Sequence, residues 1–204
     1  MKSEYYDIPG QNQWKSCTLV DKGWSSDKKY YIETIASEQY LLRVSDASEY
    51  EKKAKEYKLL KKLEQLELPL SKPLDFGYCH NETLVYMLLT WMPGVDAAAN
   101  MPKFTVEEHY NLGVEAGLIL KKLHSLEAPE DWPEWSSHFN KKIDRNIKKY
   151  LDCPHQVEGL EHVIDYLDTH RSCLEDRPLR FHHGDYHCGN MTLTDEGQLG
   201  IIDF

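Results

Sequence analysis

The sequence predicts an α+β protein with two lobes: a small lobe with an antiparallel sheet and one helix, and a mainly helical second lobe. Two observations indicate this architecture. Short runs of β-branched and aromatic residues, separated by turn residues, fill the first ninety positions and are interrupted by a single helical pattern. After residue 91 the apolar residues recur mainly at helical spacing. We therefore place the lobes at residues 1–91 and 92–204.

Three strands are expected at the start of the chain. Residues 16–22, 29–35 and 39–45 are short runs rich in Tyr, Ile, Val and Leu. Turn-forming clusters separate them at residues 23–27 and 36–38. Because tight turns join antiparallel neighbours, the simplest arrangement of the three strands is an antiparallel meander.

A helix is expected to begin at Ser48, where residues 48–51 match the capping-box pattern. Its apolar positions recur at helical spacing and predict one buried face, made of Tyr50, Ala54, Tyr57, Leu60 and Leu63. Pro69 ends the helical pattern. Residues 73–79 and 83–90 then predict a hairpin that completes the first lobe.

The second lobe is expected to contain three helices, over residues 105–127, 133–152 and 156–174. The first opens on a capping box between Thr105 and Glu108. Its predicted buried stripe consists of Leu112, Ala116, Ile119, Leu120 and Leu123. Three short strands are expected at residues 179–182, 191–194 and 198–202.

Composition excludes several classes of protein. The net charge of −10 disfavours nucleic acid as a partner and is compatible with a cationic one. The five cysteines are scattered without a C-x-x-C pair, which argues against a disulfide framework and a structural zinc site. The longest apolar stretch, residues 84–92, is too short to cross a membrane, and the N-terminus lacks a signal peptide's apolar core. We expect a cytoplasmic protein with no membrane partner.

The residues that carry chemistry lie near the end of the chain. Residues 183–190 read H-G-D-x-x-x-x-N, and a predicted strand ends in I-I-D-F thirteen residues later. Phosphoryl transfer needs a carboxylate to orient the attacking hydroxyl and oxygen ligands to hold Mg²⁺ against the phosphates. Asp185 suits the first task, and the Asn190 amide oxygen and the Asp203 carboxylate suit the second. The two strands between Asn190 and Asp203 fold the chain back and bring both oxygens together.

Two alternatives use the same residues differently. A polar turn between two strands also places Asp and Asn where they can cap backbone groups. A metal-dependent hydrolase is suggested by His182, His183, Asp185 and His187, because H-H-G-D-Y-H is superficially similar to the H-x-H-x-D-H cluster of such enzymes. That spacing fails, however, since Phe181 stands where the first histidine belongs.

The segment resembles the phosphate-transfer motif of the aminoglycoside phosphotransferase and choline kinase family, H-G-D-x-H-x-G-N followed by I-D-F or I-D-W. The resemblance implies a protein-kinase-like fold that uses ATP and Mg²⁺ to phosphorylate a hydroxyl of a small molecule. It makes Asp185 the catalytic aspartate and Asn190 and Asp203 the metal ligands. His183 matches the motif histidine, which shapes the loop. Cys188 replaces a proline that is frequent in the family.

The resemblance also implies a nucleotide site in the first lobe. Arg43 stands on the third predicted strand, where kinases carry the cation that reaches the phosphates; an exposed edge-strand arginine is the alternative. Its helix partner is Glu56, with Glu51 as a rival that the sequence does not exclude. Ser25 and Ser26, in the turn that covers the phosphates, would offer backbone N–H groups. The connector between the lobes, residues 90–94, would bind adenine through the carbonyl of Thr90 and the amide of Met92.

The acceptor is left open by the sequence. Candidates are an aminoglycoside or another antibiotic, choline or a related amino alcohol, and a sugar, with the acidic balance favouring a cation. In the family, further helices after the I-D-F strand build much of the acceptor pocket. The resemblance therefore implies that the C-terminal part of the second lobe is missing. It adds two alternatives: an inactive fragment, or a kinase-like protein that binds nucleotide without catalysis.

Overall fold

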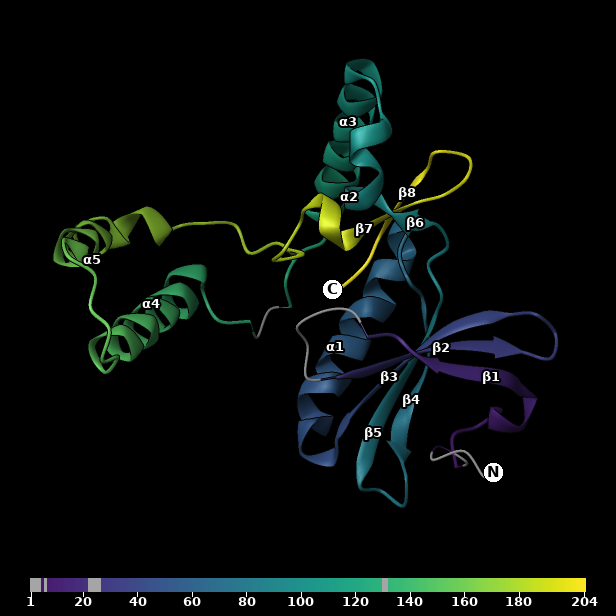
Figure 1. Ribbon diagram of the computed structural model, residues 1–204. Coiled ribbons are helices and arrows are strands. Elements are labelled where there is room, and N and C mark those ends of the chain that lie inside the picture. The colour runs from purple at the N-terminus through teal and green to yellow at the C-terminus, as the bar shows by residue number, and fades with distance from the viewer. Residues whose placement is uncertain (1–4, 6, 22–26, 130–131) are drawn as a thin grey trace. The chain divides into compact units, whose positions relative to one another are not determined.

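The computed structural model describes residue 5 and residues 7–21, 27–129 and 132–204 (Figure 1). The chain divides into two compact units. The larger contains the residues up to 123 together with residues 183–204, and the smaller contains residues 124–182. The lobe boundary at residue 91 stays a prediction.

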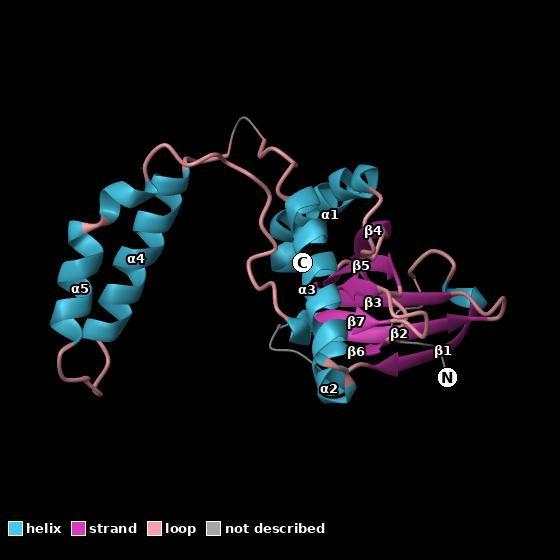
Figure 2. Cartoon of the chain, turned by 90° about the horizontal axis from the view of Figure 1, so that it is seen from above, coloured by secondary structure: helices cyan, strands magenta, loops and turns pink. Residues whose placement is uncertain are grey.

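The larger unit is built on a five-stranded antiparallel sheet in the order β1-β2-β3-β5-β4. Figure 2 shows its strands in magenta. Their bounds are Trp14–Leu19 for β1, Lys28–Thr34 for β2, Gln39–Asp46 for β3, Pro73–Cys79 for β4 and Leu84–Thr90 for β5. The predicted meander and hairpin are both confirmed, because β1, β2 and β3 pair in sequence and β4 pairs with β5.

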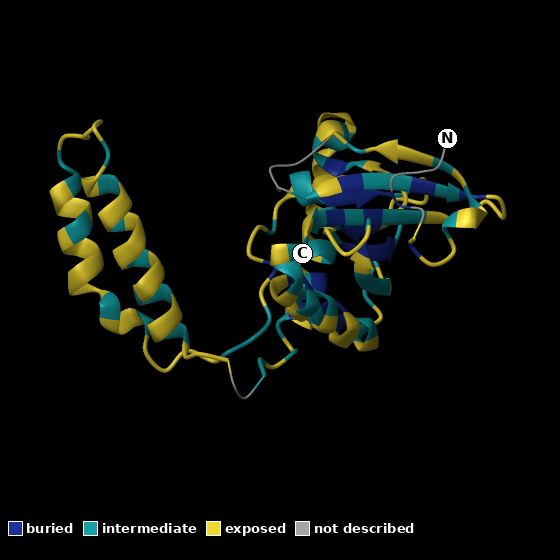
Figure 3. Ribbon diagram, turned by 90° about the horizontal axis from the view of Figure 1, so that it is seen from below, coloured by how far each residue is buried: buried dark blue, intermediate teal, exposed yellow. Residues whose placement is uncertain are grey.

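The register of the sheet separates its two faces. Lys29 lies opposite Arg43, and Arg43 lies opposite Met87, so these three side chains share one face. Side chains of the other face form a buried apolar cluster together with two residues that precede β1, Tyr5 and Ile8. The members from the strands are Ile32, Leu42, Val44, Cys79, Tyr86 and Leu88. Figure 3 shows the buried strand positions in dark blue. One face of the sheet is therefore ordinary core, and the other carries charged side chains.

Helix α1 (Tyr50–Leu63) packs against β4 and β5. Its predicted apolar face is confirmed: Leu60 and Leu63 are buried, and Tyr50 stacks on Tyr78 with 4.3 Å between ring centroids. The predicted cap at Ser48 is wrong. The carboxylate of Asp46 accepts the hydrogen bond from the Ser48 amide at 2.9 Å, because β3 ends there and a short 3₁₀ turn intervenes before the helix.

A three-stranded sheet in the order β6-β7-β8 follows in the same unit. Its strands are β6 (Val95–Asp96), β7 (Met191–Leu193) and β8 (Leu199–Ile201), and helix α2 (Ala97–Asn100) follows β6. The sequence did not predict β6 or α2, since elements of two and four residues carry no measurable periodicity. The capping box of helix α3 (Val106–Leu123) is confirmed: the Thr105 amide donates to Glu108 at 2.7 Å, and the Glu108 amide donates to the Thr105 hydroxyl at 3.3 Å.

Glycine is required where the connector between the two sheets meets β7. Gly94 has φ +110°, and a Cβ there would lie 2.5 Å from the Leu193 carbonyl oxygen. Gly200 on β8 is less constrained, because a Cβ there would meet the flexible side chain of Met92, with its sulfur at 2.5 Å. The absence of a side chain at these glycines allows the connector to lie directly against the small sheet.

The smaller unit contains helices α4 (Trp135–Leu151) and α5 (Leu160–Thr169). The Arg171 guanidinium joins them through ion pairs of 2.7 Å to Asp144 and Asp168. The predicted strand at residues 179–182 is wrong: an isolated bridge between Glu127 and Arg180 stands there, because a strand needs a continuous partner. Among the described residues, no helix has the length and apolar character needed to span a lipid bilayer.

Candidate active site

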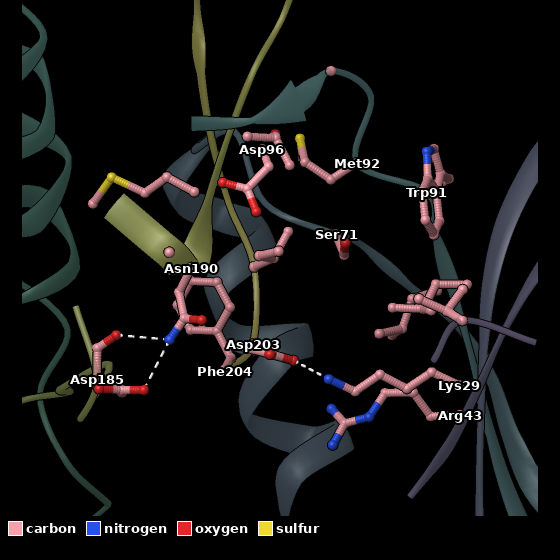
Figure 4. Close-up of a pocket in the computed structure, with 18 of the residues that line it drawn as sticks. Lys29, Arg43, Ser71, Trp91, Met92, Asp96, Asp185, Asn190, Asp203 and Phe204 are labelled. Atoms are coloured by element: carbon pink, nitrogen blue, oxygen red, sulfur yellow. Dashed lines mark hydrogen bonds and ion pairs between the residues drawn. The ribbon is translucent and has the colours of Figure 1, made fainter. Parts of the chain in front are cut away.

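A cavity of about 700 Å³ opens in the larger unit. Its walls come from β2, β3 and β5, from the connector after β5, and from the segments around residues 185–192 and 202–204. The side chains that matter below are labelled in Figure 4: Lys29, Arg43, Met92, Asp185, Asn190, Asp203 and Phe204. Sites for small molecules and cofactors commonly have volumes of about 300–1,000 Å³.

The loop before β7 holds Asp185 and Asn190 together. The side-chain nitrogen of Asn190 donates to the Asp185 backbone carbonyl at 2.9 Å and to its carboxylate at 3.0 Å (Figure 4). The amide oxygen of Asn190 is therefore the atom left to bind a cation. Gly184, at φ +85°, supplies the left-handed turn that presents Asp185.

His183 links this loop to the strand end that carries Asp203. Its Nε2 lies 2.9 Å from the Ile202 carbonyl oxygen, which can only accept, so Nε2 carries the proton. The other ring nitrogen, Nδ1, accepts from the Asp185 amide at 3.3 Å. The ring is buried, and the Phe204 ring packs on it with 4.6 Å between centroids. His183 thus links Asp185 to the strand end that carries Asp203.

Tyr186 anchors the same loop to α3, a role that the sequence analysis did not assign. Its hydroxyl donates to the Ala116 carbonyl at 2.7 Å. Burial, and then the charge of Glu115, raise the pKa of Tyr186 to about 12, so the hydroxyl keeps its proton and remains a donor.

Asp203 lies just beyond β8 with φ +62°, a conformation uncommon for a non-glycine residue. Its carboxylate accepts from the ammonium group of Lys29 on β2 (Figure 4). The Lys29 side chain is buried, whereas the Asp203 side chain is 39% exposed. The sequence did not single out Lys29, because nothing in the run Lys28-Lys29-Tyr30-Tyr31 says which lysine faces the cavity.

Arg43 belongs to a partly buried cluster of four charged side chains, with Glu56, Asp27 and Lys53. Its guanidinium donates to Glu56 at 2.5 Å and to Asp27 at 2.7 and 3.1 Å. The Lys53 ammonium lies 2.5 Å from Asp27 and 3.2 Å from Glu56. The structure thus places Glu56 beside Arg43, whereas Glu51 is exposed. Two cations and two anions make the cluster neutral, a condition for burying charge at tolerable cost.

Because of this cluster, the free energy of unfolding should depend on pH in the acid range. Burial alone would raise the pKa of Asp27, but the hydrogen bond from Lys53 and the charge of Arg43 outweigh it and lower the pKa to about 2. A carboxylate with a depressed pKa stabilises the fold above its ordinary pKa of 3.8 and loses that contribution as the pH falls toward 2. We expect about 2 kcal/mol of the free energy of unfolding to disappear between pH 4 and pH 2 on this account.

Urea denaturation at several pH values measures this effect. Asp27→Asn should be less stable than the unsubstituted protein at pH 7, because two buried cations lose a partner. The difference should shrink as the pH falls from 4 to 2. The matched control is Asp21→Asn, at an exposed position of the same hairpin. Parallel stability curves for the Asp27→Asn and unsubstituted proteins would contradict the assignment.

Most residues that the sequence proposed for the site do lie around the cavity. Those that line it are Arg43, Met92, Asp185, Asn190 and Asp203. His183 and Glu56 contact Asp185 and Arg43 respectively. Thr90 ends β5, where its hydroxyl accepts from the Lys72 amide at 2.8 Å. Ser25 and Ser26 lie outside the described residues.

The histidines suggested for a hydrolase centre have other partners. The His182 ring packs against the His124 and Trp135 rings, at centroid distances of 4.8 and 5.2 Å. Both nitrogens of His183 are engaged, and Nδ1 of His187 accepts from the Gly189 amide at 3.0 Å. Within the described ranges, no three His, Cys, Asp or Glu side chains gather as a metal-binding group. The donors that Asn190 and Asp203 offer are oxygens, which suit Mg²⁺ completed by phosphate oxygens and water.

Comparisons with known proteins agree with this geometry. Residues 16–204 match the phosphotransferase enzyme family, APH. The sequence has no match among the curated proteins. Similar solved structures include a thermostable mutant of aminoglycoside phosphotransferase APH(4)-Ia in its apo form, with a TM-score of 0.65 and 16% identity over 96% of this chain and 69% of that one.

Two further structures were solved with ligands. Aminoglycoside phosphotransferase APH(3'')-Id from Streptomyces rimosus ATCC10970, in complex with ADP and streptomycin, has a TM-score of 0.59 and 16% identity over 97% of this chain and 72% of that one. Amicoumacin kinase hAmiN, in complex with AMP-PNP, Ca²⁺ and Ami, has a TM-score of 0.59 and 15% identity over 92% of this chain and 57% of that one. At these identities the likeness shows the fold, and the predicted bilobal kinase-like fold class is confirmed.

Proposed function

Because this chain belongs to the phosphotransferase enzyme family, we propose that it transfers the γ-phosphoryl group of ATP to a hydroxyl group of a small molecule, using Mg²⁺. The observation that carries the proposal is the meeting of Asp185, Asn190 and Asp203 at one cavity, with the spacing of a kinase catalytic loop. The three side chains supply one hydroxyl-orienting carboxylate and two oxygen ligands for a hard cation.

Each residue of the loop has a distinct task in this proposal. Asn190 and Asp203 hold Mg²⁺, which neutralises charge on the phosphates when bound. The Asp185 carboxylate accepts the hydrogen bond of the acceptor hydroxyl and takes its proton as the oxygen attacks. His183 is a positioning residue, because its two hydrogen bonds join Asp185 to the strand end before Asp203.

The nucleotide would lie between the sheet and the connector. We assign the adenine edge to the Thr90 carbonyl and the Met92 amide, in line with the position of the connector at the cavity wall. The ion pair of Arg43 and Glu56 would flank the phosphate end, where Arg43 lines the cavity. Backbone amides of Ser25 and Ser26 complete the phosphate site in this proposal.

A cationic acceptor is the class we propose. The net charge of −10 favours cations over anions. Two of the similar structures are an aminoglycoside phosphotransferase with bound streptomycin and an amicoumacin kinase. Choline and related amino alcohols share the positive charge and the free hydroxyl.

ADP release measured with Mg·ATP and single acceptors tests the function. Streptomycin, kanamycin, choline and homoserine form a suitable panel. We expect release that depends on one of the cationic acceptors and disappears when EDTA removes the metal. Tight binding of Mg·ATP with no acceptor-dependent release would favour a nucleotide-binding protein without catalysis. No binding of ATP at all would contradict the proposal.

A further inference from the structure

Two cationic side chains from neighbouring strands, Lys29 and Arg43, line the cavity, and they have different hydrogen-bond partners. Lys29 on β2 lies directly opposite Arg43 on β3, so both side chains reach the same face and both line the cavity (Figure 4). We propose that Lys29, and not Arg43, is the cation that contacts the nucleotide phosphates, with Arg43 serving as an anchor. This inference rests on the proposed phosphotransferase function.

Arg43 is already committed to protein carboxylates. Three of its nitrogens donate to Asp27 and Glu56 at 2.5–3.1 Å. The Asp27 side chain is 3% exposed. Turning the guanidinium toward a phosphate would take a partner from the Asp27 carboxylate, which is costly in a low-dielectric environment. The geometry therefore favours Arg43 as the group that holds β3, α1 and the start of β2 together.

The cluster around Arg43 also offers little net charge to an anion. Lys53 is the second cation of the cluster, and its ammonium is shared between Asp27 and Glu56. With two positive and two negative members, the four charges balance. A triphosphate would be attracted weakly by such a neutral group compared with a cation outside it.

Lys29 meets the requirements that Arg43 does not. Its ammonium lies at the Asp203 carboxylate, the group to which we assign the metal. If Asp203 holds the metal, as proposed, the phosphates that the metal would neutralise lie at the same end of the cavity, so a cation beside Asp203 would also be within reach of them. An ammonium group has three donors and can contact Asp203 and a phosphate oxygen together. The buried aliphatic part of Lys29 holds the ammonium in that place.

Calorimetric titration of the full chain with Mg·ATP and with adenosine tests the assignment. Lys29→Met keeps the apolar stem and removes the charge. We expect it to weaken Mg·ATP binding about tenfold or more, because a charge-assisted hydrogen bond is lost, and to change adenosine affinity less than about twofold. Lys29→Arg should recover part of the Mg·ATP affinity.

Two matched variants separate the cations. Lys28→Met changes the same charge one residue away, at an exposed position on the opposite face, and should leave both affinities unchanged. Arg43→Met should lower the melting temperature and weaken Mg·ATP and adenosine binding by a similar factor, as expected of an anchor. A selective loss of Mg·ATP affinity in Arg43→Met, with none in Lys29→Met, would overturn the assignment.

Other outcomes are equally decisive. A rise in Mg·ATP affinity in Lys29→Met would show that Lys29 competes with the metal for Asp203, which also overturns the assignment. Unchanged, tight Mg·ATP binding in Lys29→Met would contradict the role of Lys29 and leave the phosphotransferase proposal standing. If the unsubstituted chain binds neither Mg·ATP nor adenosine, the proposed function itself fails and the assignment falls with it.

Discussion

Asp185→Asn is expected to lower kcat for acceptor-dependent ADP release by about 10²-fold or more, with little change in Mg·ATP affinity. In the proposed mechanism the carboxylate orients the hydroxyl and accepts its proton, and both tasks stabilise the transition state more than bound nucleotide. The substitution keeps the size of the side chain. Steady-state kinetics at saturating acceptor and calorimetry with Mg·ATP measure the two quantities separately.

A control for this variant is available in the turn between β7 and β8. Asp195→Asn removes a carboxylate from an exposed position close in sequence and should leave kcat unchanged. The loop should stay folded in Asp185→Asn, because the backbone amide and carbonyl of residue 185 keep their contacts to His183 and Asn190. Near-normal turnover of Asp185→Asn would remove Asp185 from the mechanism.

Asp203→Ala is expected to weaken Mg·ATP binding by about 10²-fold or more and to leave adenosine binding nearly unchanged. Even residues that only support a metal ligand typically contribute about 10–100-fold to metal affinity, so deletion of a ligand should cost at least as much. In the proposed site the adenine end is formed by the connector, which this substitution does not touch. Calorimetry with both ligands provides the comparison.

The metal dependence of the loss is the internal control. In EDTA, ATP should bind Asp203→Ala at least as well as the unsubstituted protein, because a negative charge near the phosphates has been removed. Equal losses for Mg·ATP and adenosine would instead indicate a disrupted fold. A circular dichroism melt of the same sample distinguishes that case from loss of a ligand.

The catalytic loop could be predicted from the sequence because its geometry is local. Asp185 and Asn190 are five residues apart, and their hydrogen bonds close within one turn of chain. Asp203 follows a short hairpin, β7 and β8, which returns the chain to the same point. Residue types and spacing were therefore sufficient to predict that these three side chains lie close together.

Elements with strong periodicity were also predictable. The runs rich in β-branched and aromatic residues predicted β1 to β5, and the apolar stripes predicted α1 and α3. Elements without such a stripe were missed or misassigned. Residues 95–100 were too short to show a period, and residues 179–182 have strand composition but only an isolated bridge to pair with.

The sequence by itself determined the phosphoryl-transfer motif, the class of fold and the candidate metal ligands. Tertiary structure alone decided which charged side chains meet. Lys29 faces Asp203, and Asp27 and Lys53 join Arg43 and Glu56, only because the β2–β3 register and the packing of α1 bring them to one face of the sheet. Both residues of the Lys28-Lys29 pair are polar, so hydrophobic periodicity does not predict which of the two faces the cavity. The physical reason is that burial of a charge depends on a partner supplied from a distant part of the chain.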